Sequence, residues 1–206
     1  MEKQKRVILI GGTSNAGKTT VARFLAEENG WVHKSTDHLA KHPGRPWVAH
    51  PNTVPPHVVE HYLSLSGDEL IASVIEHYRS LWLVIESLVR EHCEDATKPR
   101  LVLEGSALMP ANVVSLRSEG LSAVWITGDN HLLEARIHAE SRYADADRTG
   151  KTLIDKFVER TLRFDRLIKR DAIRLGLPTV AADEVSSVEG LAQWCLAAMR
   201  RPNAAG

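Results

Sequence analysis

One stretch near the start of the chain combines residue types that suit the binding of phosphate groups. Residues 12 to 19 read Gly-Thr-Ser-Asn-Ala-Gly-Lys-Thr and match the pattern G-x-x-x-x-G-K-[ST]. Glycine lets backbone N–H groups turn inward around phosphate oxygens, and a helix that begins at Lys18 adds the partial positive charge of its N-terminus. We therefore predict a nucleotide site formed by Gly12, Thr13, Ser14, Asn15, Ala16, Gly17, Lys18, Thr19 and Thr20.

Three of the predicted roles follow from side-chain chemistry. Lys18 is expected to reach the β and γ phosphates of ATP, and the Thr19 hydroxyl is expected to bind Mg²⁺. Glu104 ends the apolar run Leu-Val-Leu-Glu, which is a predicted strand. Its carboxylate is therefore expected at the edge of the sheet where the phosphate loop begins, and there it would orient Mg²⁺ or a water bound to it. Binding of a substrate is the competing role for Glu104.

Asp37 is the candidate general base. It ends the segment Ser35-Thr36-Asp37 after a predicted strand, which would bring it to the carboxyl edge of the sheet beside the phosphates. A carboxylate there can accept the proton of a hydroxyl that attacks the γ-phosphorus. The alternative is an aspartate that only caps a helix or a turn.

Two further segments carry cations that suit an anionic ligand. The histidine-rich segment 38 to 56 is expected to be an irregular loop of an acceptor pocket, with His38 and Arg45 in contact with the acceptor and His42 and His50 nearby. Segment 136 to 152 is expected to be a mobile lid over the phosphates; a solvated helix end, with its arginines paired to nearby aspartates, is the alternative. Its basic residues are Arg136, Arg142, Arg148 and Lys151.

The residues after this segment favour another interpretation. From Glu159 to Arg174, basic and acidic side chains alternate along a predicted helix, and Arg160 is one of them. Such a pattern is typical of a solvated face with salt bridges. The H-x-x-E-H pattern at residues 57 to 61 resembles that of some zinc peptidases, but no third ligand can be named.

The hydrophobic patterns predict alternating strands and helices in one domain. We expect strands at 7–10, 31–37, 100–105, 122–128 and 177–183. We expect helices at 18–29, 57–65, 68–92 with Asp68 as its cap, 112–118, 130–141 after a cap at Asp129, 153–175 and 187–200. This alternation predicts an α/β fold with a parallel sheet covered by helices on both faces.

Composition narrows the class of protein. The chain has 26 basic and 26 acidic residues, so it lacks the excess positive charge of a general nucleic-acid binder. Its cysteines, Cys93 and Cys195, form no C-x-x-C pair, and no apolar run approaches the length of a membrane span. We expect a cytoplasmic protein with a small-molecule partner and no membrane partner; the composition leaves its oligomeric state open.

The stretches "GGTSNAGKTT", "STD", "LVLEGSAL" and "RIHAESRY" together resemble the small P-loop kinases of the nucleoside-monophosphate-kinase type, over about residues 7 to 183. In motif the chain is most similar to 2-phosphoglycerate kinase, chloramphenicol phosphotransferase and the zeta-toxin kinases. The resemblance implies a three-layer P-loop NTPase fold with strand order 2-3-1-4-5, a helical insertion within residues 38–95 and a lid at 136–152. One departure is Ala40, where several relatives have an arginine.

The same resemblance implies roles for individual residues. Asp37 would be the base, Arg142 or Arg148 the catalytic arginine of the lid, and adenine would lie near Ala181 and Ala182. The predicted function is an ATP- and Mg²⁺-dependent kinase that phosphorylates a hydroxyl of a small metabolite or antibiotic. The alternatives are a regulatory ATPase without a small-molecule acceptor and a nucleic-acid 5′-hydroxyl kinase.

Overall fold

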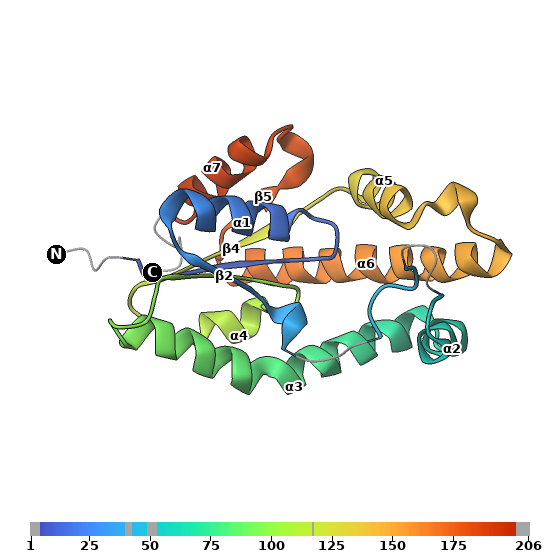
Figure 1. The fold of residues 1–206 in the computed structure, drawn as a ribbon, viewed down its shortest axis with the longest axis horizontal. Coiled ribbons are helices and arrows are strands. Elements are labelled where there is room, and N and C mark those ends of the chain that lie inside the picture. Colours follow the sequence, from blue (N-terminus) through green and yellow to red (C-terminus); the bar gives the residue numbers. More distant parts are fainter. Residues whose placement is uncertain (1–4, 40–42, 49–52, 117, 201–206) are drawn as a thin grey trace.

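A computed structural model gives the structure of residues 5–39, 43–48, 53–116 and 118–200. Within these residues the strands form one parallel sheet in the order β2-β3-β1-β4-β5 (Figure 1). The strands are β1 (Val7–Gly12), β2 (Val32–Ser35), β3 (Leu101–Glu104), β4 (Leu121–Thr127) and β5 (Thr179–Ala181). The predicted fold class and strand order are confirmed.

The helices lie between the strands along the chain. The longer ones are α1 (Lys18–Asn29), α2 (Pro56–Ser64), α3 (Gly67–Glu94), α5 (Asn130–Ser141), α6 (Arg148–Arg174) and α7 (Val188–Ala198). The short ones are α4 (Pro110–Val114) and the 3₁₀ helices η1 (Thr36–His38), η2 (Tyr143–Asp145) and η3 (Ala182–Glu184). None of the described helices combines the length and apolar character needed to cross a membrane.

The sheet is buried on both faces because successive side chains of a strand point to opposite sides. In β1, Val7 and Leu9 pack with α3, α4 and the C-terminal half of α6, whereas Ile8 and Ile10 pack with α1 and α7. Figure 1 shows α1 and α7 on one side of the sheet and α3 and α4 on the other. This three-layer arrangement explains why β1 reads as a continuous apolar run.

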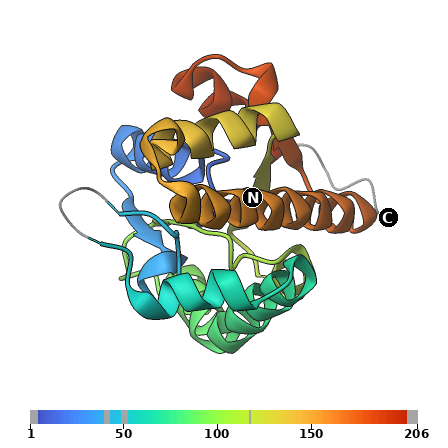
Figure 2. The ribbon, with the colours of Figure 1, turned by 90° about the vertical axis from the view of Figure 1, so that its right-hand side faces the viewer.

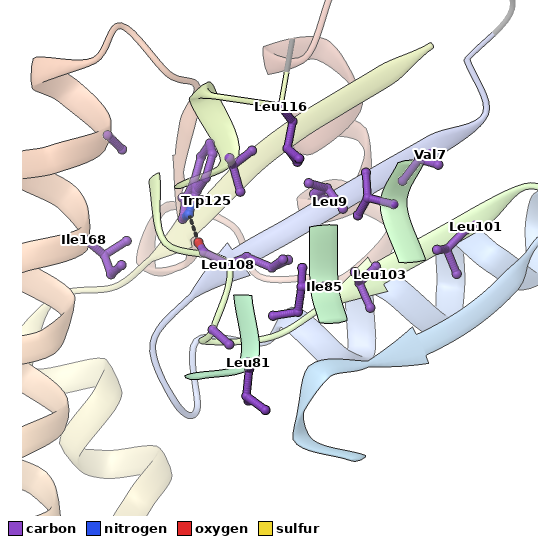
Figure 3. Close-up of a cluster of buried hydrophobic side chains, with 14 of the residues drawn as sticks. Val7, Leu9, Leu81, Ile85, Leu101, Leu103, Leu108, Leu116, Trp125 and Ile168 are labelled. Carbon is purple, nitrogen blue, oxygen red and sulfur yellow. Dashed lines mark hydrogen bonds between the residues drawn. The ribbon is translucent and has the colours of Figure 1, made fainter. Parts of the chain in front are cut away.

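A tryptophan braces the strand that leads into the phosphate-binding loop. Trp125 of β4 is almost fully buried, and its indole Nε1 donates a hydrogen bond of 2.8 Å to the carbonyl of Leu108 (Figure 3). A Cβ atom on Gly11 would lie only 2.3 Å from that Nε1. The close approach of strand and indole therefore requires glycine at position 11 and leaves the end of β1 little room to move.

Helix α6 ties the helical insertion to the rest of the molecule. It lies between α5 on one side and α2 and α3 on the other (Figure 2). Tyr62 of α2, Leu70 of α3, Ile137 of α5 and Phe157 of α6 belong to one buried apolar cluster. The helices after β2 thus pack against α6 in the same buried cluster that α5 joins.

The structure corrects some predicted helix boundaries. α3 begins at Gly67 with Ser66 as its cap rather than Asp68, because Ser66 and Glu69 exchange the hydrogen bonds of a capping box. α6 begins at Arg148 rather than near 153, with Asp147 accepting a hydrogen bond from the N–H of Gly150. Segment 142–147, part of the predicted lid, holds the short helix η2.

Candidate active site

The loop between β1 and α1 has the backbone shape that an anion site needs. Gly12, Asn15 and Gly17 have φ values of 133°, 62° and 101°, all in the region that favours glycine. A Cβ atom on Gly12 would lie 2.1 Å from the carbonyl oxygen of Ile126, so no other residue fits there. The strand, loop and helix that the sequence motif requires are therefore all present.

Lys18 places its ammonium group inside this loop. The side chain is buried, and its Nζ donates a 2.6 Å hydrogen bond to the carbonyl of Thr13. Burial lowers the pKa of Lys18, and the charges of Glu104 and Asp37 partly offset that effect. A bound polyphosphate would add further negative charge around this ammonium.

Thr19 and Glu104 meet at the floor of the site, although 85 residues separate them in sequence. The Thr19 hydroxyl donates a 3.2 Å hydrogen bond to Oε1 of Glu104, which is 2% exposed. A hydroxyl and a carboxylate are oxygen donors of the kind Mg²⁺ prefers, and Mg²⁺ bound with a nucleotide needs few ligands from the protein. The residues therefore fit the predicted metal. Within the described part of the chain, no three His, Cys, Asp or Glu side chains form a metal cluster.

Asp37 lies on η1, directly after β2, and lines the same cavity as Lys18 and Glu104. Ser35 caps η1 by accepting a hydrogen bond from the N–H of Asp37, so the Asp37 carboxylate is not the cap. Among the described residues, no hydrogen bond or ion pair engages that carboxylate. The structure thus brings the predicted base to the predicted phosphate site.

The cavity at the carboxyl edge of the sheet has a volume of about 740 Å³, within the range of small-molecule sites. One end lies at the phosphate loop and at residues 185–188 and Leu191, near the end of the sheet that carries β5. Further residues of the lining are Gly44, Arg45, His77, Tyr78, Leu81, Ser106, Ala107, Phe157 and Arg160. Ala181 and Ala182, predicted beside adenine, do not line the cavity.

The arginines of the predicted lid differ in where they lie. Arg136 lines the cavity, and its Nη1 donates a 3.1 Å hydrogen bond to the carbonyl of Asn15. Arg142 is exposed and pairs with Asp145, and Arg148 is exposed at the start of α6. Neither Arg142 nor Arg148 lines the cavity in this structure, so their catalytic role stays a prediction.

Two of the predicted acceptor-binding residues also differ in position. Arg45 lines the cavity and pairs with Glu140 of α5, whose carboxylate also accepts a 2.6 Å hydrogen bond from Nδ2 of Asn15. His38 is exposed and does not line the cavity. Residues 40–42 and 49–52, which include His42 and His50, lie outside the described residues.

The prediction of a solvated face along α6 is wrong for Arg160 and Asp165. These side chains are only 6% and 4% exposed, whereas Arg163, Arg170 and Arg174 make ion pairs at the surface as expected. The reason is the position of α6, which packs against helices on opposite sides. Tyr78 of α3, which is half-buried, also lines the cavity.

Several solved structures have the same fold at low sequence identity. A gluconokinase from Sinorhizobium meliloti 1021 is 19% identical, with a TM-score of 0.51 over 96% of this chain and 93% of its own. A sugar kinase from Janibacter sp. HTCC2649 is 16% identical, with a TM-score of 0.52 over 94% and 93%. A shikimate kinase from Aquifex aeolicus vf5 is 14% identical, with a TM-score of 0.51 over 93% and 95%.

No family model and no curated protein matches the chain. The narrower resemblance to 2-phosphoglycerate kinase, chloramphenicol phosphotransferase and the zeta-toxin kinases stays a prediction. The structural neighbours and the strand order together show that this chain has the fold of the small P-loop kinases.

Proposed function

We propose that this protein is an ATP- and Mg²⁺-dependent phosphotransferase that moves the γ-phosphate to a hydroxyl group of a small acceptor. The observation that carries the proposal is one cavity lined by Lys18, Thr19, Glu104 and Asp37. These four side chains come from three elements of the sheet edge and supply a cation, a hydroxyl and two carboxylates. The fold shared with kinases of sugars and shikimate supports the same conclusion.

Each side chain has a role that fits phosphoryl transfer. Lys18 and the inward N–H groups of the loop hold the phosphates in place and balance the negative charge of the transition state. Thr19 and Glu104 would hold Mg²⁺, which when bound neutralises charge on the β and γ phosphates. Asp37 accepts the proton of the acceptor hydroxyl while the hydroxyl oxygen attacks the γ-phosphorus, and ADP leaves.

The shape of the cavity favours a small acceptor. We place the nucleotide base toward residues 185–188 and Leu191, and the acceptor toward Asp37, Tyr78 and Arg160. In this assignment the insertion within residues 38–95 forms the wall on the acceptor side. Segment 136–152 acts as the lid, with Arg136 already positioned at the phosphate loop.

The proposal is tested by measuring ADP release from Mg·ATP with and without a panel of acceptors. The panel contains sugars, sugar acids, phosphoglycerates, nucleosides, and aminoglycoside and phenicol antibiotics. We expect one class to stimulate release, and we expect Lys18→Met to lower the stimulated rate by on the order of 100-fold or more. Lys98→Met, which changes an exposed lysine paired with Glu91, is the matched control and should keep wild-type activity.

Two results would contradict the proposal. ATP turnover that no acceptor stimulates, together with a protein complex that forms only with nucleotide, would indicate a regulatory ATPase instead. Equal loss of activity in Lys18→Met and Lys98→Met would show that the effect does not come from the phosphate loop.

A further inference from the structure

Arg160 is a buried cation at the acceptor end of the cavity. Its side chain is 6% exposed, it lies on α6, and it lines the cavity together with Phe157. The guanidinium carbon lies 4.5 Å from the ring centroid of Phe157 and 5.7 Å from that of Tyr62. Nη1 donates a 2.7 Å hydrogen bond to the Tyr62 hydroxyl. The aromatic rings hold the planar group in one orientation.

Within the described part of the chain, Arg160 has no carboxylate partner. Other arginines near it are paired: Arg163 with Asp68 and Glu159, and Arg45 with Glu140. Arg160 is more deeply buried than Arg163 or Arg45. Burial of a charge without an ionic partner lowers the stability of the folded state. Cation–π contacts and one hydrogen bond to a neutral hydroxyl offset part of that cost, and the other donors of the guanidinium have no hydrogen-bond partner among the described residues.

The location of Arg160 relative to Asp37 matters for the acceptor. Tyr78 is half-buried and lines the cavity, and the charges of both Arg160 and Asp37 act on its hydroxyl. Burial raises the pKa of its hydroxyl to about 12, and the charges of Arg160 and Asp37 act on it in opposite directions. Asp37, Tyr78 and Arg160 also line the same cavity, so one bound molecule can face both charged groups.

We propose that Arg160 binds an anionic group of the acceptor, a carboxylate or a phosphate, while a hydroxyl of the same molecule faces Asp37. The acceptor is then an acidic hydroxy compound rather than a neutral sugar, nucleoside or antibiotic. A planar guanidinium with free donors can bind either oxyanion with two hydrogen bonds. The inference rests on the proposed phosphoryl transfer for the role of the hydroxyl, but the anion site itself can be tested without turnover.

A purely structural role for Arg160 makes a different prediction. Among the described residues its one hydrogen bond goes to the Tyr62 hydroxyl, and that hydroxyl also donates a 2.7 Å hydrogen bond to the carbonyl of Gly44. Removing Arg160 therefore leaves the Tyr62 donor satisfied. Loss of a buried unpaired charge should keep or raise the thermal midpoint of the unliganded protein, whereas loss of a structural contact should lower it.

The test measures binding of charged and neutral probes to protein saturated with Mg²⁺ and the β,γ-imido analogue of ATP, so that the phosphate loop is already occupied. Gluconate and glycerate are the carboxylate probes, glycerol 3-phosphate is the phosphate probe, and glucitol and glycerol are their neutral counterparts. We expect at least one anionic probe to bind at least 10-fold more tightly than its neutral counterpart. The carboxylate and phosphate arms distinguish the two sources of the oxyanion.

Three variants assign the effect to one side chain. Arg160→Met should weaken binding of the anionic probe by on the order of 100-fold, and Arg160→Lys, which keeps the charge but loses the planar pair of donors, should weaken it less than Arg160→Met does. Arg163→Met is the matched control on the same helix and should bind the probe as the wild type does. In turnover with an anionic acceptor, Arg160→Met should raise the KM for that acceptor and leave the KM for ATP unchanged.

The inference is overturned if the neutral counterparts bind wild-type protein as tightly as the anionic probes, or if no anionic probe binds. It is also overturned if Arg160→Met keeps wild-type affinity. The comparison of charged and neutral probes needs no variant, so it decides even if Arg160→Met fails to fold. Anion binding through Arg160 without acceptor-stimulated ADP release would reject the proposed function and keep the anion site. Release of ADP stimulated only by neutral acceptors would support the proposed function and reject the anion site.

Discussion

At the scale of single residues, the proposed chemistry depends most directly on Asp37. Its carboxylate is close enough to Lys18, His77 and Tyr78 for its negative charge to act on the pKa of each. Among the described residues, nothing hydrogen-bonds to that carboxylate, so it is available to a ligand. A carboxylate that lines the cavity, and that no described residue engages, suits a general base better than a cap.

We predict that Asp37→Asn lowers kcat by on the order of 10² to 10⁴-fold and leaves the affinity for ATP nearly unchanged, because the amide cannot accept the proton of the hydroxyl. The measurement is acceptor-dependent ADP release together with direct titration of nucleotide. Asp68→Asn is the control, since Asp68 is exposed and pairs with Arg163. Turnover at the wild-type rate in Asp37→Asn would remove Asp37 as the base.

Asp165 gives a prediction about stability rather than catalysis. Burial raises the pKa of its carboxyl to about 6 from 3.8, with the charge of Asp183 acting in the same direction and Lys169 opposing it. A carboxyl group whose pKa is raised in the folded state binds more protons when folded than when unfolded. The loss of folding stability caused by ionising this buried group is therefore absent below about pH 4 and complete above about pH 6. Stability should therefore fall as the pH rises through this window.

Asp165→Asn removes this titration. The variant should match the wild type near pH 4 and be more stable near pH 7.5, by up to about 3 kcal/mol in the free energy of unfolding. Urea unfolding at the two pH values measures the difference. Glu76→Gln, which changes an exposed ion pair with Arg79, should shift stability by less than about 1 kcal/mol. A difference for Asp165→Asn that does not change with pH would contradict the prediction.

At the scale of elements, α6 does more than cover the sheet. It presents Arg160 to the cavity, and the carbonyl of Thr161 accepts a 3.2 Å hydrogen bond from the Thr13 hydroxyl of the phosphate loop. Its C-terminal half packs Phe164 and Ile168 into the core beneath the sheet. One helix therefore contacts the phosphate loop through Thr161 and lines the cavity with the adjacent Arg160.

The turn after β3 gives a second prediction at this scale. Gly105 has φ of 152°, and a Cβ atom there would lie 1.7 Å from Oγ1 of Thr36. Gly105→Ala should destabilise the fold by about 3 kcal/mol and displace Asp37 and Glu104, which adjoin the contact, since Thr36 is buried and its Cβ would lie 2.8 Å from the added atom, so that rotation of the Thr36 side chain cannot relieve the overlap. Urea unfolding and ADP release measure the two effects.

Gly30→Ala is the control for Gly105→Ala. Gly30 also has positive φ, at 63°, but an added Cβ atom would meet nothing within 4 Å. It should cost about 1 kcal/mol, from backbone strain alone. Equal losses in the two variants would show that the contact between Gly105 and Thr36 contributes little.

At the scale of the whole molecule, parallel strands bring distant segments to one edge. β1 leads into the loop with Lys18, β2 ends before Asp37, and β3 ends at Glu104. Because the strand order is β2-β3-β1, the three ends are neighbours in space. The helical insertion and α6 then close the far side of the cavity.

Binding of Mg·ATP should raise the free energy of unfolding of the whole protein. At a free concentration 100 times the dissociation constant, we expect about 2.7 kcal/mol of added stability, seen as a higher thermal midpoint. Chelation of Mg²⁺ should reduce the rise, since Thr19 and Glu104 then meet the nucleotide without the cation. Lys18→Met should show little rise and Lys98→Met a normal one; an equal rise in both would locate nucleotide binding elsewhere.

Much of this architecture follows from local sequence. The apolar run of β1, the glycines of the loop and the stripes of the helices predict the α/β class, because each depends on neighbours within a few residues. The boundaries at Ser66 and Asp147 were less accurate, since competing polar residues can each serve as a cap. The candidate site follows from sequence where the motif is local, as at Lys18 and Thr19.

The sequence by itself determined the strands, the phosphate loop and the chemical types of Asp37 and Glu104. Only the tertiary structure decided that Arg160 is a buried cation beside the cavity, that Arg136 rather than Arg142 or Arg148 lines it, and that Tyr78 faces it. In the sequence of α6, Arg160 cannot be told from the arginines that form ion pairs. The difference is one of burial, and burial depends on which helices pack around each residue. Of the helices around α6, α2 and α3 come from a distant part of the chain, whereas α5 is the α-helix directly before it.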